Sequence, residues 1–151
     1  MNWQNKKFSA LTTNELYDIL KLRVDIFVVE QTCYYPELDN HDRHPNTQHI
    51  FCYQDNKIQA YLRILPQGLT YDNYVSIGRV AIAESARGSG FGHKLMTQGI
   101  KICQKLYPEQ AIKISAQQHL EKFYQHHDFS KVSAMYLEDN IPHIAMLRPA
   151  K

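Results

Sequence analysis

A glycine-rich segment at residues 87–92, Arg-Gly-Ser-Gly-Phe-Gly, carries residue types that can hold a diphosphate. Its three glycines let the backbone turn tightly and approach a ligand closely. A helix that begins directly after such a turn points free N–H groups and the positive end of its dipole at that ligand. Arg87 adds a fixed positive charge, so we expect a phosphate-bearing molecule to bind here.

Two common phosphate-binding motifs do not fit this segment. A P-loop requires Gly-Lys-Ser/Thr after its last glycine, whereas His93 and Lys94 follow Gly92 here. A dinucleotide-binding turn requires G-x-G-x-x-G, whereas the spacing here is G-x-G-x-G. The pattern that fits is Arg-x-x-Gly-x-Gly, formed by Arg87, Gly90 and Gly92. A strand-to-helix turn that binds no ligand is the other interpretation of these residues.

The elements on both sides of the segment would hold it in place. An apolar run at residues 75–82 predicts a strand before it. Residues 91–106 predict a helix after it, because their apolar side chains form one stripe that ends before Pro108. Near the N-terminus, Thr12 and Glu15 form a capping box that opens another helix, which runs to about residue 28.

The remaining segments complete one domain over residues 1–151. Residues 31–47 predict a long polar loop, and a β-hairpin follows with strands at 49–53 and 58–65. A strand at 112–116, a short helix at 118–127 and two strands around the turn at Asp139-Asn140 finish the chain. The order is helix, three strands, helix, strand, helix and two strands.

This pattern resembles the GNAT N-acetyltransferase superfamily, whose acyl-CoA pyrophosphate loop has the form Arg-x-x-Gly-x-Gly between a strand and a helix. Further segments resemble this family, and in part its small bacterial ElaA-type branch: residues 22–23, 27–31, 78–80, 116–117, 123–124, 129 and 141–146. One departure is Asp128, where the family commonly has glycine. Residues 23–27 also resemble acyl-homoserine-lactone synthases, which share the fold.

The resemblance implies an α/β (α+β) fold with a mixed central β-sheet of about six to seven strands flanked by helices. It implies acetyl-CoA as co-substrate and no metal. The pantetheine arm would run beside the strand at 80–82, and a backbone N–H there would hold the oxyanion. The implied cofactor-binding residues are Val80, Ala81, Ile82, Arg87, Gly88, Ser89, Gly90, Phe91, Gly92 and His93.

Acetyl transfer to an amine also requires a base, because an alkyl ammonium has a pKa of about 10.4 and only the neutral amine attacks. Glu30, at the end of the first helix, is the leading candidate, and His119 and His143 are alternatives. Each of them is otherwise a surface or capping side chain. By resemblance, Tyr124 would donate a proton to the departing thiolate, and its other interpretation is core packing beside Phe123.

We therefore expect an acetyl-CoA-dependent N-acetyltransferase that acts by direct transfer on a primary amine of a small molecule or peptide. The alternative is a catalytically inactive acyl-CoA-binding sensor or interaction module. Neither the acceptor nor the length of the acyl chain follows from the sequence. The polar loop at residues 31–47 is expected to shape the acceptor pocket.

Two other groups of polar residues could carry chemistry. The set of Cys33, Asp39, His41, His44 and His49 offers possible zinc ligands, but it lacks the spacing of zinc motifs, so no metal is expected. Arg63 and Arg79 lie within predicted strands, where an inward-facing charge requires a partner or an anionic substrate. We expect these two arginines on the solvated face.

Composition limits the remaining function classes. The 151 residues are 44% hydrophobic and 21% charged, which is typical of a globular domain. Net charge is only +2 with no basic run, so nucleic acid is not an expected partner. No apolar stretch approaches the ~18 residues of a membrane span, and no membrane partner is expected. Three scattered cysteines and the lack of a signal peptide favour the cytoplasm, and a monomer or homodimer is expected.

Overall fold

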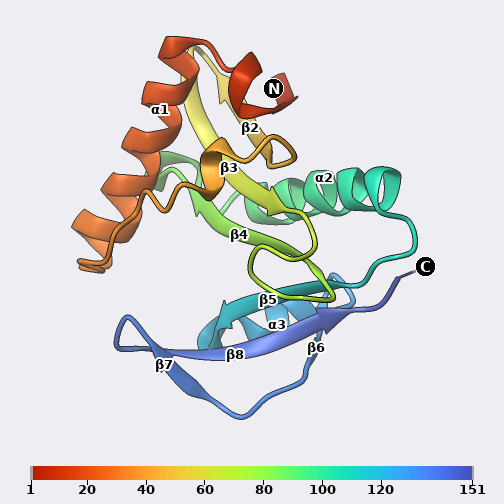
Figure 1. Cartoon of the computed structure of the whole chain (residues 1–151). Helices are drawn as coiled ribbons and strands as arrows, with labels where there is room; N and C mark the ends of the chain where they lie inside the picture. The colour runs from red at the N-terminus through yellow and green to blue at the C-terminus, as the bar shows by residue number, and fades with distance from the viewer. Residues whose placement is uncertain (1, 151) are drawn as a thin grey trace.

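The computed structural model describes residues 2–150 and shows one eight-stranded sheet between helices (Figure 1). The strand order is β1-β2-β3-β4-β5-β8-β6, and β7 pairs with β8. All pairs are antiparallel except β4 and β5, so the expected α/β fold with a mixed central sheet is confirmed. The strands are β1 (Asn2–Lys6), β2 (Gln48–Gln54), β3 (Lys57–Leu65), β4 (Val75–Ile82), β5 (Ile112–Gln117), β6 (Ser130–Lys131), β7 (Tyr136–Glu138) and β8 (Ile141–Arg148).

Three α-helices and five other helical segments connect the strands. The capping box is present: the backbone N–H of Glu15 donates to Thr12 Oγ1 at 3.1 Å, and the N–H of Thr12 donates to Glu15 Oε1 at 2.9 Å. The first helix continues without a break into a π-helical segment that ends at Glu30. The α-helices are α1 (Thr13–Arg23), α2 (Phe91–Leu106) and α3 (Glu121–Gln125). The others are η1 (Phe8–Ala10), η2 (Val24–Glu30), η3 (His41–Arg43), η4 (Glu84–Ala86) and η5 (Gln118–Leu120).

Helices α1 and α2 cover opposite faces of the sheet. Side chains of a strand alternate between faces, so Leu62 packs against α2 whereas its neighbour Tyr61 packs against α1. The α2 side holds the larger core, which includes Leu95 and Met96, both fully buried. Two separate cores therefore fix the sheet between helices, and α2 is held with its first turn beside the C-terminal end of β4.

The sheet opens between β4 and β5. These two strands are paired only at Val75 with Ile112 and at Ser76 with Lys113. Beyond that point they diverge, and Figure 1 shows the two arrows spreading apart toward their C-terminal ends. The backbone groups on this edge of β4 are consequently left without a neighbouring strand, which makes them available to a ligand.

Two backbone features near this opening involve left-handed residues that are not glycine. Arg79 has φ of 53° and lies where the pairing of β3 with β4 shifts register, which is the geometry of a β-bulge. Asp128 has φ of 69° at the end of the turn that follows α3. Aspartate tolerates this conformation better than most residues, so Asp128 takes the turn for which the family commonly uses glycine.

No helix within residues 2–150 is both long enough and apolar enough to cross a membrane.

Candidate active site

A cavity of about 520 Å³ lies where β4 and β5 diverge. One wall is the end of β4 at Val80, Ala81 and Ile82, and the opposite wall includes Ser115 and Gln117 of β5. Gln117 Nε2 donates to Gln31 Oε1 at 3.2 Å, which joins β5 to the end of η2 across the opening. The cavity thus lies in the split of the sheet, with β4 and β5 as its walls.

The glycine loop forms one end of this cavity, where Arg87 and Gly92 line it. Gly88 and Gly90 have φ of 81° and 80°, which side chains rarely adopt, and a Cβ on Gly90 would meet no atom within 4 Å. No side chain caps the first turn of α2, so its N–H groups are free. Open space and free donors at a helix N-terminus suit a phosphate group.

The other predicted loop residues support the loop from outside the cavity lining. Ser89 Oγ donates to the carbonyl of Ala86 at 2.7 Å, which closes the turn. Phe91 is buried against Trp3, with ring centroids 6.2 Å apart. His93 Nδ1 lies 2.9 Å from His127 Nε2 and its ring packs on Phe123.

Glu30 lies at the same end of the cavity, bound to Arg87. Its carboxylate accepts hydrogen bonds from Arg87 Nη1 and Nη2 at 2.8 and 2.9 Å. This contact lowers the pKa of Glu30, although the side chain is 46% exposed. The cation expected to bind a diphosphate is therefore occupied by a carboxylate, and Glu30 points toward the loop.

Tyr124 lies on the cavity wall, where α3 reaches the divergence of the strands. It is 7% exposed, and burial raises the pKa of its hydroxyl to about 12. The hydroxyl is therefore protonated at neutral pH, as a proton donor must be. Its ring also packs edge-on against Phe123 and Phe129, so the residue contributes to the core as well.

The end of the cavity away from the glycine loop is rich in titratable groups. His143, one of the two alternative bases, lies there with Glu37 and Glu138, and His119, the other alternative, also lines the cavity. Burial and then the carboxylates of Asp139, Glu37 and Glu138 raise the pKa of the Cys33 thiol. These three carboxylates therefore converge on one region beside Cys33.

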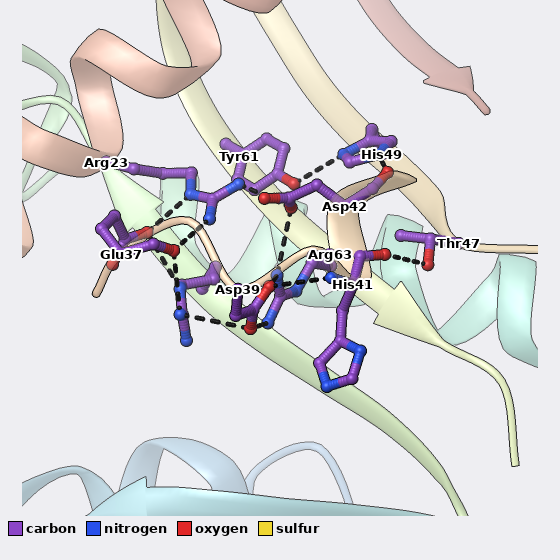
Figure 2. A network of polar contacts seen from close by, with 10 residues as sticks. Arg23, Glu37, Asp39, His41, Asp42, Thr47, His49, Tyr61 and Arg63 are labelled. Carbon is purple, nitrogen blue, oxygen red and sulfur yellow. Dashed lines mark hydrogen bonds and ion pairs between the residues drawn. The ribbon is translucent and has the colours of Figure 1, made fainter. Parts of the chain in front are cut away.

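A network of arginines and carboxylates supports this end of the cavity (Figure 2). Arg23 is fully buried and donates to Glu37 Oε2 at 2.7 Å and to Asp42 Oδ1 at 2.8 Å. Arg63 is 4% exposed and donates to both oxygens of Asp39 at 2.8 Å. The network ties α1 and β3 to the loop that shapes the cavity.

Arg79 joins the same network through the bulge in β4. Its Nε donates to Glu37 Oε2 at 2.9 Å, and its side chain is 28% exposed. The expectation that Arg63 lies on the solvated face is wrong, because Arg63 has two buried or half-buried carboxylates as partners. An isolated arginine in a strand pattern gives no sign of partners that are distant in sequence.

Asp39 and His49, two of the possible zinc ligands, have other partners. Asp39 binds Arg63, and His49 Nδ1 lies 2.7 Å from the hydroxyl of Tyr61 while its Nε2 donates to the carbonyl of Asp42 at 3.0 Å. Within the described part of the chain, no three His, Cys, Asp or Glu side chains are grouped to hold a metal ion.

Sequence reasoning located the loop, the β4 wall and Tyr124, and the structure brings Val80, Ala81, Ile82, Arg87, Gly92 and Tyr124 around one cavity. Sequence reasoning did not single out Ser115, Glu37 or Glu138. These residues are close only because β5, β7 and the loop before η3 meet in space. The alternation of polar with apolar residues along β5 was the one available sign of Ser115 and Gln117.

A split sheet, with a glycine-rich loop and titratable groups around one cavity, is the arrangement expected of a CoA-dependent acyltransferase. The model of the acetyltransferase (GNAT) domain family matches residues 24–148. Protein ElaA of Escherichia coli K12 is 38% identical over 148 residues, which is 98% of this chain and 96% of ElaA. The chain belongs to the GNAT acetyltransferase family.

Solved structures agree with this assignment. A crystal structure of an acyl-CoA N-acyltransferase from Pseudomonas aeruginosa is 41% identical and superposes with a TM-score of 0.92, over 97% of this chain and 98% of that one. Escherichia coli ElaA gives the same TM-score at 37% identity, with the same coverage. The acyl-homoserine lactone synthase BjaI, at 16% identity and a TM-score of 0.77 over 95% and 80% of the two chains, shares the fold.

Proposed function

We propose that this protein is an acetyl-CoA-dependent N-acetyltransferase that transfers the acetyl group directly to a primary amine of a small molecule or peptide. The observation that carries the proposal is a single cavity lined by Arg87 and Gly92 at one end and by Glu138 and His143 at the other. Val80 and Tyr124 line the stretch between these ends. A thioester and an amine can therefore meet beside a proton donor.

In this proposal the pyrophosphate of acetyl-CoA binds the first turn of α2 and Arg87, and the pantetheine arm runs along the free edge of β4. The backbone groups of β4 beyond Ser76 have no partner in β5, so they can hydrogen-bond the arm. An N–H on the same edge, between Val80 and Ile82, would stabilise the tetrahedral oxyanion. The family's description as acetyltransferases supports acetyl as the acyl group.

The chemistry then requires two proton transfers. The amine loses a proton and attacks the thioester carbonyl, and Tyr124 donates its proton to the sulfur as the C–S bond breaks. Direct transfer is favoured over an acyl-cysteine intermediate, because the raised pKa of Cys33 keeps that thiol protonated and unreactive. The base is Glu30, His119 or His143, and the pairing of Glu30 with Arg87 favours the histidines.

The three cysteines, Cys33, Cys52 and Cys103, are free thiols. Free thiols are usual in a reducing compartment, which supports the proposal of a cytoplasmic enzyme.

Calorimetry with CoA, followed by a screen of amines, amino acids and peptides with acetyl-CoA, tests the proposal. We expect micromolar CoA binding and release of free thiol with a subset of amines. Gly90→Val should weaken CoA binding in a folded protein, because a β-branched residue is strained at φ of 80° and blocks the approach of the diphosphate. No binding at millimolar CoA would refute the proposal. Binding without turnover of any amine would favour the inactive acyl-CoA sensor instead.

A further inference from the structure

Three polar side chains on β5 and β7 form a hydrogen-bonded chain on the cavity wall away from the glycine loop, and His143 of β8 lies beside its end. The hydroxyl of Tyr136 lies 2.6 Å from Ser115 Oγ, and Ser115 Oγ donates to Glu138 Oε1 at 3.1 Å. Serine has a single O–H hydrogen, so Tyr136 must be the donor to Ser115. The other oxygen of Glu138, Oε2, lies 3.5 Å from His143 Nε2. The chain thus fixes one carboxylate oxygen and leaves the second facing a histidine.

The tautomer of the neutral His143 ring follows from its contact with the carbonyl of Ile141. His143 Nδ1 lies 2.7 Å from the carbonyl oxygen of Ile141, and a carbonyl only accepts hydrogen bonds. Nδ1 therefore carries the hydrogen, and Nε2 has a free lone pair beside Glu138. The ring is 6% exposed and is stacked on Tyr136, with centroids 6.2 Å apart and planes 24° apart. Its orientation is therefore fixed before any substrate binds.

We propose that the acceptor binds as an ammonium ion that bridges Glu138 Oε2 and His143 Nε2 from the cavity, and that His143 removes its proton there. This inference rests on the acetyl transfer proposed above and identifies both the base and the charge of the acceptor. Ser115 and Tyr136 are positioning residues, because they act only through Glu138. The carboxylate attracts the ammonium group and then stabilises the imidazolium that forms.

The protons balance over one turnover. His143 Nε2 takes a proton from the ammonium group, and the neutral nitrogen forms a C–N bond with the thioester carbon. As the C–S bond breaks, the sulfur takes a proton from Tyr124. The new amide nitrogen then loses its second proton to solvent, and solvent returns a proton to the tyrosine. The imidazolium releases its proton to solvent, so the products are an amide, free CoA and one proton.

The surrounding charges favour a cationic acceptor. Of the three carboxylates that converge beside Cys33, Glu37 is bound by Arg23 and Arg79, whereas Glu138 and Asp139 contact no arginine or lysine among the described residues. Three cations line an adjoining smaller cavity with Glu138 and are themselves engaged. They are Arg63, which is bound by Asp39 and Asp42, Arg79, which is bound by Glu37 and Asp39, and Lys113, which lies over the rings of Tyr71 and Tyr74.

The test adds n-butylamine hydrochloride as the probe to the full chain with CoA bound. The readout is the chemical shift of the imidazole nitrogens, measured by NMR. The His143 signals are assigned by their loss in His143→Gln. We expect the probe to shift them in the wild type and in Glu109→Gln, which removes an exposed carboxylate outside the cavity. In Glu138→Gln the shift should be lost, although His143 and its stacking on Tyr136 are retained.

An unshifted His143 at tens of millimolar probe, in a protein that still binds CoA by calorimetry, would overturn this inference and leave the proposed function intact. Loss of CoA binding itself would count against the proposed function, so the two failures are distinguishable. An equal shift in wild type and Glu138→Gln would remove Glu138 from the site.

The positioning role is tested by a pair of variants at Ser115. Ser115→Ala should weaken the probe-induced shift of His143 several-fold, and Ser115→Thr, which keeps the hydroxyl, should restore it. If Ser115 had only a structural role, the folded Ser115→Ala and Ser115→Thr variants would show the same probe-induced shift of His143. Equal shifts would therefore remove Ser115 and Tyr136 from the proposal.

Discussion

At the scale of single residues, the pairing of Glu30 with Arg87 places a carboxylate where an anionic cofactor is expected to bind. Both side chains are more than a third exposed, so the ion pair contributes little to the stability of the fold. It can still compete with the diphosphate for the same guanidinium. In this view Glu30 restrains cofactor binding and does not serve as the base.

Glu30→Gln is accordingly expected to strengthen CoA binding. An exposed pair is worth roughly 0.2–1 kcal/mol, so the gain should be about 1.4- to five-fold in the dissociation constant measured by calorimetry. The matched control is Asp25→Asn, which removes an exposed carboxylate from its pair with Lys21 on the same helical run and should change nothing. Unchanged or weaker CoA binding would refute this competition, and loss of the acidic limb of the pH–rate profile would return Glu30 to the role of base.

Tyr124 allows a catalytic hydroxyl to be separated from a packing ring. The thiolate of CoA leaves fairly well without protonation, so Tyr124→Phe should lower kcat by on the order of 10²-fold and leave CoA affinity and Tm nearly unchanged. Tyr124→Ala should also lose on the order of 3 kcal/mol of stability, because it removes a buried ring. A Phe variant with wild-type kcat, measured where the chemical step limits turnover, would show that Tyr124 only packs.

At the scale of elements, the sequence predicts most of the units that form the cavity, because these carry strong local signals. The capping box at Thr12, the stripe of α2 and the hairpin at Asp55-Asn56 are all present. Strand β1 was missed, since its polar residues pair through the backbone at the sheet edge. The two-residue β6 is too short to have a pattern. The divergence of β4 from β5 is a property of three-dimensional pairing and leaves no mark in either strand.

The contact between α2 and β3 holds the helix that presents the glycine loop. A Cβ on Gly99 would lie 2.8 Å from Leu62 Cδ2, and Leu62 is fully buried. Gly99→Ala gains about 1 kcal/mol in helix propensity but overpacks this contact at a cost of about 1–3 kcal/mol. We expect a net loss of roughly 1 kcal/mol in urea unfolding, restored by adding Leu62→Val. A more stable Gly99→Ala protein would mean that the helix moves away from the sheet freely.

At the scale of the whole molecule, the arginine and carboxylate network joins α1, β3 and β4 through the loop that precedes β2. Sequence reasoning placed that loop beside the acceptor but could not find the network, because each pair joins residues far apart in the chain. The ElaA-type resemblance predicted the fold. It did not predict that Arg23 and Arg63 point inward, because that direction depends on packing. The network therefore links the stability of the fold to the shape of the acceptor end.

The network makes stability depend on acidic pH in a defined direction. Burial alone would raise the pKa of Asp39, but hydrogen bonds and charge from Arg63, with Arg79, lower it to about 2, and the pKa of Asp42 is lowered in the same way by Arg23 and Arg63. An unfolded aspartate has a pKa of about 3.9. A carboxylate with a lowered folded pKa stabilises the protein above the unfolded value, and this stabilisation is lost as the pH falls toward the folded value.

We therefore expect the free energy of unfolding to fall between about pH 5 and pH 2, with Asp39 contributing on the order of 1–2 kcal/mol after discounting for its partial exposure. Urea unfolding across this range provides the measurement. Asp39→Asn should lower stability at neutral pH and flatten the acid dependence, since Arg63 loses a charged partner at every pH. Asp25→Asn, whose carboxylate is exposed, should follow the wild-type curve. An Asp39→Asn protein with the same slope as wild type would show that the acid sensitivity arises at other carboxylates.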